Sequence, residues 1–353
     1  MLTSRPIHYI VWRFTLGGAE LVVQQYAKAF GEQQDLFAYS IRRPTHDIFE
    51  GMRIETEVGE DSNWRCYWLY FQYCRRYRDD IFHLNNPGPI ITFLTLLAGV
   101  RNPICHLHGT IYWHTNLQKR FRKFFWNMVS WFKVKYLAVS KHAAQMFTKN
   151  VLPQQPSIIY NGIQTDTFLA KSHRRVTLNK IGYAGRLYEG KNVDLIIKLF
   201  EEVAEDYPQL ELHIAGDGPL RSQLEQQAEQ TGFADRIKFL GFISDMPSFY
   251  SSIDAFIFLS AYESFGNVLV EALLTGAPVL TSEVPVFKEI YGEEKDFVLG
   301  DFRDYKTISE NFKDRLTNYS VLAEKGYAMI ETIQEQFSIE KHLSQVKKVY
   351  EHY

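Results

Sequence analysis

The sequence predicts an α/β protein of two domains, each built on a doubly wound parallel sheet. The first observation is the length, because 353 residues are about two typical domains. The second is the composition: 46% hydrophobic and 23% charged residues are ordinary for a globular chain and exclude a disordered or fibrous one. The third is that short apolar runs alternate with helix-compatible segments, as in a parallel sheet covered on both faces.

In the first half, the predicted strands are short apolar runs bounded by polar or glycine residues. Ile7–Trp12 is the first; the Gly17–Gly18 turn and the helical pattern of Ala19–Phe30 follow, which opens a βαβ unit. The other predicted strands are Phe37–Ile41, Asp80–Leu84, Ile104–His108, Lys135–Ser140 and Pro156–Tyr160. Predicted helices between them include Trp64–Arg78 and Leu117–Phe132.

The second half repeats this plan. Its predicted strands are Lys180–Gly185, Leu210–Ala215, Ile237–Leu240, Ala255–Leu259 and Pro278–Thr281. Its predicted helices are Asn192–Asp206, Pro219–Thr231, Pro247–Ser251, Asn267–Leu274 and, last, Ile339–Tyr353. A polar stretch near Gln164–Arg174 marks the boundary, so we expect an N-terminal domain over 1–165 and a C-terminal domain over 166–338. Ligands of such sheets bind at the carboxyl ends of the strands.

Cysteine usage and hydropathy indicate a reducing compartment. Three cysteines, Cys66, Cys74 and Cys105, are too few for a disulfide framework, and no C-x-x-C pair suggests a zinc site. The first residues lack the apolar core of a signal peptide, and the apolar run near Pro87–Val100 is too short to span a bilayer. We expect a cytoplasmic chain, either soluble or peripheral on the inner face of the membrane.

Charge is divided unevenly along the chain. Residues 1–165 carry a net +8 and residues 166–353 a net −10, and from Arg101 to Thr165 there is no acid against nine Lys+Arg. Within this stretch, 117–135 combines clustered cations with Trp and Phe, which predicts a helix lying on an anionic membrane surface. The alternative is a helix whose aromatic residues pack on the core. Nucleic acid is not an expected partner, because no recognition motif is present.

The segment with the most functional information is Tyr262–Gly276, YESFGNVLVEALLTG. Glu263 follows a predicted strand, and a helix whose first amides lack partners and attract anions begins near Ser264–Gly266. Glu271 lies two turns into that helix among strongly apolar neighbours. A solvated helix face is the alternative, but a carboxylate among buried residues needs a partner or a function.

The same segment resembles the E-x7-E region of retaining glycosyltransferases of family 4, which have the GT-B fold of two facing Rossmann-like domains around a cleft. Further stretches resemble the family in order: GGAELVVQQYAKAF, IIYNGIQTDTF, IGYAGRLYEGKNVDLII, LHIAGDGPLRSQLE and IKFLGFISDMPSFYSSIDAFIFLS. Ile339–Tyr353 resembles the family's last helix, which crosses back to the first domain. The resemblance covers most of the chain and is densest from residue 156 to 290.

The resemblance implies a nucleotide-sugar donor site. Arg186 and Lys191 bind the donor diphosphate in this reading, whereas each alone would be taken for an ordinary loop charge. No D-x-D triplet occurs, so we expect no metal and no cofactor besides the donor as co-substrate. Glu263 contacts the transferred sugar and Glu271 the ribose hydroxyls. The other implied donor residues are Gly17, Gly18, Gly216, Asp217, Phe242, Ile243 and the amides of Ser264, Phe265, Gly266 and Asn267.

His108 ends the predicted strand Ile104–His108, where family members have a residue facing the donor sugar near the acceptor. A structural histidine is the alternative. His106 and His108 lack a third ligand nearby, so they do not predict a metal site.

The expected function is retaining, metal-independent transfer of a sugar, from a UDP-sugar, to a hydroxyl of a lipid-linked or polysaccharide acceptor. The family implies front-face attack, in which the departing phosphate helps to take the acceptor proton. Two alternatives stay open: another GT-B enzyme such as a nucleotide-sugar epimerase, and an inactive sugar-nucleotide-binding subunit that stabilises a partner.

Overall fold

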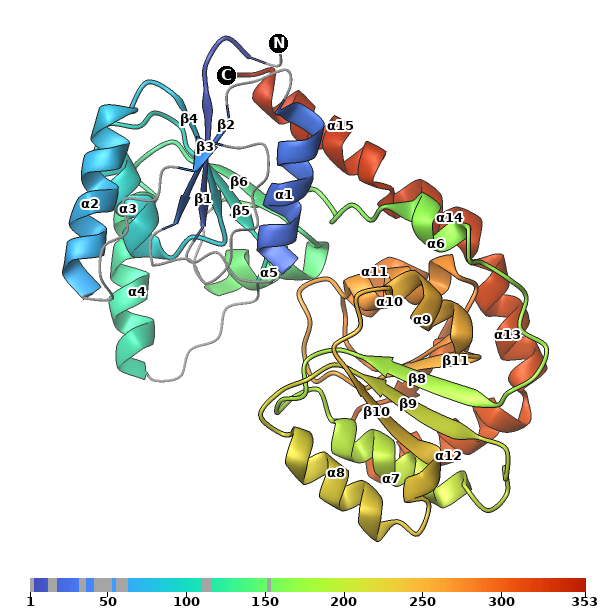
Figure 1. Cartoon of the computed structure of the whole chain (residues 1–353). Helices are drawn as coiled ribbons and strands as arrows, with labels where there is room; N and C mark the ends of the chain where they lie inside the picture. The colour runs from blue at the N-terminus through green and yellow to red at the C-terminus, as the bar shows by residue number, and fades with distance from the viewer. Residues whose placement is uncertain are drawn as a thin grey trace. The chain divides into compact units, whose positions relative to one another are not determined.

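The computed structural model describes residues 3–11, 18–31, 36–40, 53–54, 63–109, 116–150 and 154–353. The chain forms two compact units (Figure 1), unit 1 from Met1–Gly162 with Glu340–Tyr353 and unit 2 from Ile163–Ile339. Each unit has a parallel sheet with helices on both faces, so the predicted class of two doubly wound α/β domains is confirmed.

Unit 1 contains a seven-stranded parallel sheet in the order β3-β2-β1-β4-β5-β6-β7. The strands are β1 (Ile7–Val11), β2 (Leu36–Ser40), β3 (Arg53–Ile54), β4 (Ile81–Asn85), β5 (Ile104–Leu107), β6 (Lys135–Ala138) and β7 (Ser157–Ile158). All residues of β1, β4 and β5 are buried, as expected for central strands covered on both faces. The strand order reverses between β1 and β4, which is where ligands of this fold bind.

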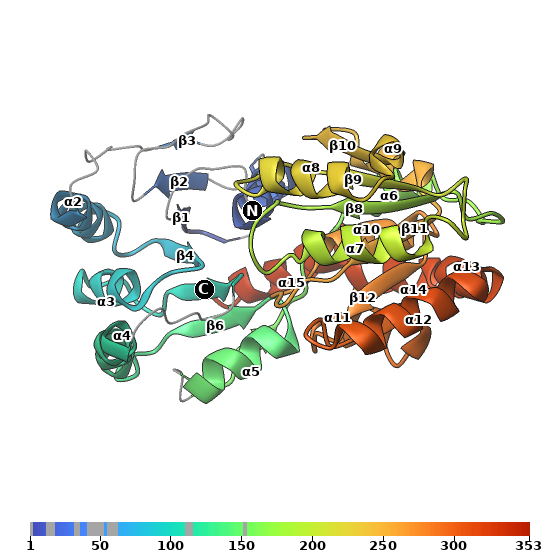
Figure 2. The same cartoon turned by 90° about the horizontal axis from the view of Figure 1, so that it is seen from below.

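Helices cover both faces of this sheet. They are α1 (Gly18–Phe30), α2 (Asn63–Arg76), α3 (Pro89–Leu97), α4 (Asn116–Val129), α5 (Lys141–Asn150) and α15 (Ile339–Tyr350). Figure 2 shows α2, α3 and α4 side by side on one face. On the other face, Val346 and Tyr350 of α15 join Val23 and Tyr26 of α1 in one apolar core. The last helix of the chain therefore completes unit 1.

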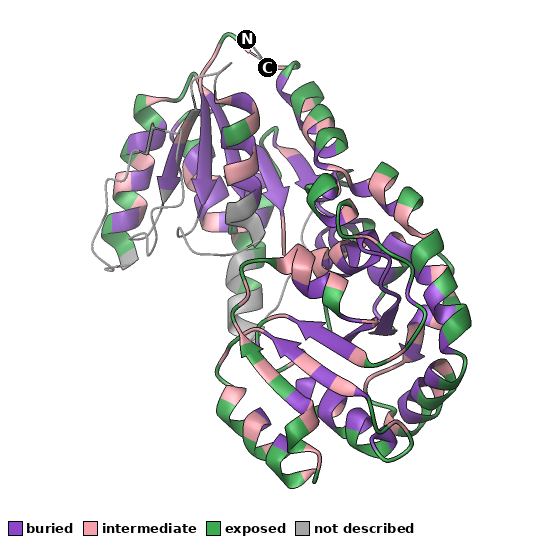
Figure 3. Cartoon of the chain, turned by 45° about the vertical axis from the view of Figure 1, so that its right-hand side comes forward, coloured by how far each residue is buried: buried purple, intermediate pink, exposed green. Residues whose placement is uncertain are grey.

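Unit 2 contains a six-stranded parallel sheet in the order β10-β9-β8-β11-β12-β13, with its reversal between β8 and β11. The strands are β8 (Lys180–Ala184), β9 (Glu211–Ala215), β10 (Ile237–Gly241), β11 (Ala255–Phe258), β12 (Val279–Ser282) and β13 (Val298–Gly300). The helices are α6 (Thr165–Leu169), α7 (Val193–Val203), α8 (Arg221–Gln230), α9 (Met246–Ser252), α10 (Asn267–Leu274), α11 (Phe287–Tyr291), α12 (Tyr305–Thr317), α13 (Tyr319–Ala328) and α14 (Ile330–Phe337). Figure 3 shows its central strands mostly buried.

Most predicted elements agree with the structure to within a few residues at each end. Several elements were not predicted, among them β13, α12 and α3. The sequence analysis assigned no element to the segment of α3; Pro89 stands in the first turn of this helix, where no amide hydrogen is needed. Among the described helices, none has both the length and the apolar character needed to cross a membrane.

Candidate functional site

The predicted donor residues of unit 2 gather at the strand-order reversal. Arg186 and Lys191 follow the carboxyl end of β8, and Glu263 follows that of the neighbouring strand β11. A backbone hydrogen bond of 2.7 Å from Ala261 to the carbonyl of Gly190 ties the two loops together. The pairing of β8 with β11 thus brings together loops that are far apart in the sequence.

The Lys191 ammonium forms an ion pair with Glu263, and both side chains are largely buried, with 11% and 17% of their surfaces exposed. Lys191 also donates to Ser260 Oγ at 3.4 Å, and its ammonium lies 4.9 Å from the centre of the Phe258 ring. An ammonium has three N–H donors, so one remains for a ligand oxygen. Sequence reasoning missed Ser260, which carries no motif signal of its own.

Arg186 is exposed at the same edge of the sheet. Its carbonyl accepts a hydrogen bond of 3.2 Å from Tyr183, while its guanidinium makes no hydrogen bond or ion pair with any residue that the structure describes. A guanidinium offers five donors in a plane that fits phosphate oxygens. The backbone of Arg186 is thus fixed by Tyr183, while its guanidinium is available to a ligand in the same loop as Lys191.

The Gly216–Asp217 turn packs directly on the β8 loop. Gly216 has φ +131°, and an added Cβ would overlap the carbonyl oxygen of Gly185, so only glycine allows this approach. Asp217 is exposed and accepts from the Gly218 amide at 2.7 Å. Of the two residues predicted to flank the base, Phe242 is 78% exposed and Ile243 is half-buried. Phe242 thus presents an aromatic face free of the core.

Helix α10 begins after Gly266, which has φ +106° and provides no side-chain cap. The N-cap residue of this helix therefore offers no side-chain acceptor to the first amides. The Phe265 ring is buried against Phe337 at 5.4 Å between ring centres, so only its backbone can meet a ligand. Ser264 and Asn267 are half-buried at this end of the helix.

Glu271 lies in α10 and accepts a hydrogen bond of 2.9 Å from the hydroxyl of Tyr250 in α9. Burial raises the pKa of Glu271 to about 7, and the bond from Tyr250 offsets only part of that rise. The expectation that this carboxylate needs a partner or a function is thus met by one partner, Tyr250. No sequence signal pointed to Tyr250, because its proximity arises from the packing of α9 on α10.

In unit 1, His108 follows β5, at the carboxyl edge of the sheet. Its Nε2 lies 3.2 Å from Oδ1 of Asn85, a residue that sequence reasoning missed. The centre of its ring lies 4.1 Å from that of His106, and the two rings are tilted by 39°. Across the described residues, no group of three or more His, Cys, Asp or Glu side chains is arranged to hold a metal ion. Helix α1 begins at Gly18, while Gly17 and Trp12 lie outside the described residues.

The basic segment divides its aromatic residues between core and surface. Trp126 is buried, and Phe125 packs at 5.8 Å on Phe93 of α3. Trp131 is 82% exposed, and Phe124 and Phe132 are also exposed. Packing on the core is therefore observed for Trp126 and Phe125, while membrane contact stays a prediction. The side chains of Lys119, Phe121 and Arg122 lie outside the described residues. The three cysteines are free, and all three are buried.

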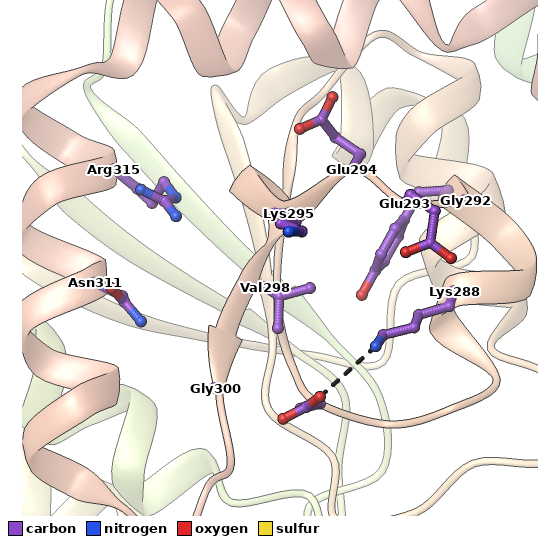
Figure 4. Close-up of a pocket in the computed structure, with 11 residues that line it drawn as sticks. Lys288, Gly292, Glu293, Glu294, Lys295, Val298, Gly300, Asn311 and Arg315 are labelled. Carbon is purple, nitrogen blue, oxygen red and sulfur yellow. Dashed lines mark ion pairs between the residues drawn. The ribbon is translucent and has the colours of Figure 1, made fainter.

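A separate hollow lies beside β13, between α11 and α12 (Figure 4). It has a volume of about 330 Å³, and none of the predicted donor residues lines it. Lys288 pairs with Glu283 at 3.7 Å, and Arg315 with Asp296 at 3.6 Å. Its charges are thus mostly neutralised from within, and we assign it no function.

Both halves of the chain match families of known proteins. Residues 164–336 match the family described as Glycosyl transferases group 1, and residues 16–167 match Glycosyltransferase Family 4. The chain is 23% identical over 362 residues to the O-antigen biosynthesis glycosyltransferase WclY of Escherichia coli, covering 98% of this chain and 97% of the relative. A putative glycosyltransferase of Bacillus subtilis, EpsF, is 28% identical over 57% of this chain and 56% of its own.

Solved structures show the same fold. The Anabaena protein Alr3699/HepE, in complex with UDP and glucose, superposes with a TM-score of 0.80 at 18% identity, covering 98% of this chain and 99% of that one. WaaG, a glycosyltransferase involved in lipopolysaccharide biosynthesis, superposes with a TM-score of 0.75 at 16% identity, covering 96% and 99%. Together with the sequence matches over both units, these findings show that the chain belongs to the group 1 and family 4 glycosyltransferases with the GT-B fold.

Proposed function

We propose that this chain is a retaining, metal-independent glycosyltransferase that moves a sugar from a UDP-sugar to a hydroxyl of a lipid-linked or polysaccharide acceptor. The observation that carries the proposal is the Lys191–Glu263 pair between the β8 and β11 loops, with Arg186 exposed in the same β8 loop and its guanidinium without a partner among the described residues. The UDP and glucose bound to HepE and the O-antigen role named for WclY support the choice of donor and acceptor class.

The proposed chemistry follows from the charges at this edge. As the glycosidic bond breaks, negative charge grows on the departing diphosphate. The third N–H of Lys191, the Arg186 guanidinium and the first amides of α10 are groups that stabilise such a charge. Glu263 holds Lys191 in place, and its second carboxylate oxygen accepts a hydrogen bond from a hydroxyl of the sugar. The acceptor hydroxyl attacks from the leaving-group side, and a phosphate oxygen takes its proton.

Metal independence rests on the cations supplied by the protein. Arg186 and Lys191 would provide the positive charge that a divalent ion supplies in other transferases. We expect transfer rates in EDTA to equal those in Mg²⁺ or Mn²⁺. A rate that falls with EDTA and returns with added metal would contradict this part of the proposal.

The site assignment is tested with isosteric variants. Removing the charge of either partner of a mostly buried ion pair leaves the other charge unpaired. Lys191→Gln and Glu263→Gln are preferred to alanine because glutamine keeps a long side chain that can still hydrogen-bond to that partner. Each should reduce transfer by about 10² or more, with the melting temperature measured alongside. The matched control is Lys288→Gln, which breaks the pair with Glu283 away from the predicted donor residues. A Lys191→Gln enzyme as active as the control would refute the assignment.

Product analysis separates the alternatives. A transferase without acceptor should slowly release free sugar and UDP from the donor, whereas an epimerase leaves an altered sugar or its derivative, and an inactive binding subunit releases nothing. The anomeric configuration of the transferred sugar, read by NMR, tests retention directly. Inversion at the anomeric carbon would overturn the retaining mechanism.

We also propose that unit 1 contacts an anionic membrane from the cytoplasmic side. The contacting residues are exposed on α4 and just after it: the aromatic Phe124, Trp131 and Phe132 with the cations Arg120, Lys123 and Lys133. A hollow of about 400 Å³ beside Phe132 has Arg101 and Lys133 in its lining. Apolar rings beside cations suit the boundary between headgroups and acyl chains.

Vesicle sedimentation tests this contact. Binding should be stronger to vesicles containing phosphatidylglycerol than to pure phosphatidylcholine, and salt should weaken it. Trp131→Ala should reduce binding, while the control Tyr327→Ala, an exposed aromatic residue of unit 2, should not. Equal binding to both kinds of vesicle would refute the electrostatic part of the proposal.

A further inference from the structure

The hydrogen bond between Asn85 and His108 fixes which ring nitrogen of the histidine carries a proton. Asn85 is the last residue of β4, and it is 4% exposed. Its Oδ1 lies 3.2 Å from His108 Nε2. Strands β4 and β5 pair in parallel, with Asn85 opposite His106. The contact is thus set by the register of two central strands.

The orientation of the Asn85 amide is set by a second contact. Its Nδ2 donates to the carbonyl oxygen of His83 at 3.3 Å. A carbonyl can only accept, so the NH₂ group must face it, and the amide oxygen must face His108. The Nε2 of His108 is then the donor in the bond to Asn85. A neutral imidazole carries one proton, so Nδ1 is left with a bare lone pair.

The surroundings keep His108 neutral. Among the described residues, the titratable groups around it are other histidines: His106, whose ring lies tilted against it, His83 next to His106, and His342 of α15. Burial, and then the charge that His342 would carry, lower the pKa of His108 to about 3. No hydrogen bond from a described residue reaches its Nδ1, so this nitrogen is available to a ligand.

We propose that Asn85 is a positioning residue for sugar transfer: it holds His108 as the Nε2–H tautomer, so that Nδ1 accepts a hydrogen bond from a substrate hydroxyl. This inference rests on the proposed function, in which His108 serves the transferred sugar or its acceptor. In this form His108 can take a hydrogen bond from a hydroxyl but cannot donate one to a phosphate oxygen. Stabilising the departing diphosphate is then left to the cations of unit 2.

The tautomer is read directly by ¹⁵N NMR of the full chain labelled at its histidine ring nitrogens. The His108 signals are assigned from the spectrum of the His108→Ala variant. At pH 7 without ligand, we expect a protonated Nε2 and an unprotonated Nδ1. An Nδ1–H tautomer, or rapid exchange between both forms, would overturn the inference without any appeal to activity.

Kinetics test the positioning role. Asn85→Ala should lower kcat by on the order of tenfold to a hundredfold with little change in UDP affinity. Asn85→Asp keeps an acceptor for Nε2–H and should recover most of the rate. Its carboxylate also favours the imidazolium, so the acidic limb of the kcat profile should move to higher pH. The control Thr92→Val removes a buried hydroxyl that contacts Cys105 of β5 at 3.8 Å and should alter stability only.

The outcomes separate the two proposals. If His108→Ala leaves transfer intact while the spectrum shows Nε2–H, the role of His108 in the proposed function fails and the tautomer assignment stands. If His108→Ala abolishes transfer but Asn85→Ala and Asn85→Asp change neither kcat nor the pH profile, only the positioning role fails. Should Asn85→Ala not fold, Asn85→Asp and the wild-type spectrum still decide the question.

Discussion

Replacing Glu271 by glutamine should make the protein more stable while weakening its donor site. Burial raises the pKa of Glu271 from 4.5 to about 7 in the folded chain, and each pKa unit is worth about 1.36 kcal/mol. Ionised Glu271 therefore costs the folded state up to about 3 kcal/mol, an upper value because the residue is only half-buried. Glutamine keeps the bond from Tyr250 and carries no charge.

The sign of the pH dependence follows from that raised pKa. The folded state holds the proton more tightly than the unfolded chain, so the penalty is absent below pH 4.5, grows between the two pKa values and is complete above about pH 7. Glu271→Gln should thus raise the melting temperature most at pH 8 and little at pH 5. At about 2–4 °C per kcal/mol for a unit of this size, the rise is at most about 12 °C.

Calorimetry at pH 8 and pH 5, on the wild type and two variants, checks this reasoning. The control is Glu229→Gln, an exposed carboxylate of α8, whose loss should not move the melting temperature at either pH. In parallel, Glu271→Gln should bind UDP more weakly than the wild type does at pH 8. If Glu271→Gln gave no stabilisation at pH 8, or the same stabilisation at both pH values, the burial argument for Glu271 would be refuted.

The remaining predictions concern the donor loops and the membrane surface. The affinity of the wild type for UDP should fall below pH 7, by up to about tenfold per pH unit, because protons compete for Glu271. Isothermal titration calorimetry at several pH values checks this, and the Glu271→Gln variant corrects for the titration of UDP itself. If the ratio of the two proteins' UDP dissociation constants stayed the same at every pH, the prediction would be wrong. Gly216→Ala should destabilise unit 2 by on the order of 1–3 kcal/mol, since its Cβ would overlap the Gly185 carbonyl, and urea unfolding would contradict this if the midpoint were unchanged. Trp131→Ala should weaken binding to anionic vesicles without changing the rate on a soluble acceptor, and an equal loss in both assays would indicate a folding defect instead.

Much of the fold could be predicted because it depends on local pattern. Apolar runs such as Lys180–Ala184 and Ala255–Phe258 are buried on both faces of a sheet, which requires continuous hydrophobicity that is visible in the sequence. The elements that escaped prediction lack such a pattern: β13 has three residues, and α3 begins with a proline that is typical of both turns and helix starts.

Residues of the candidate site could be predicted only where the local sequence around them is distinctive. Glu271 stood out as a charge among apolar residues, and Gly216 lay in the stretch LHIAGDGPLRSQLE, which resembles the family. Their partners did not stand out, because Tyr250 and Asn85 are ordinary residues whose contacts arise from helix packing and strand register.

The two doubly wound domains, the family and the loops that follow β8 and β11 can be read from the linear chain, because they depend on burial periodicity and motif order. The pairing of Lys191 with Glu263, the burial of Trp126 beside the exposure of Trp131, and the hydrogen bond from His108 to Asn85 appear only once the chain is folded. The physical reason is that hydrogen bonds and ion pairs act over a few ångströms, and which groups come that close is set by the pairing of distant strands.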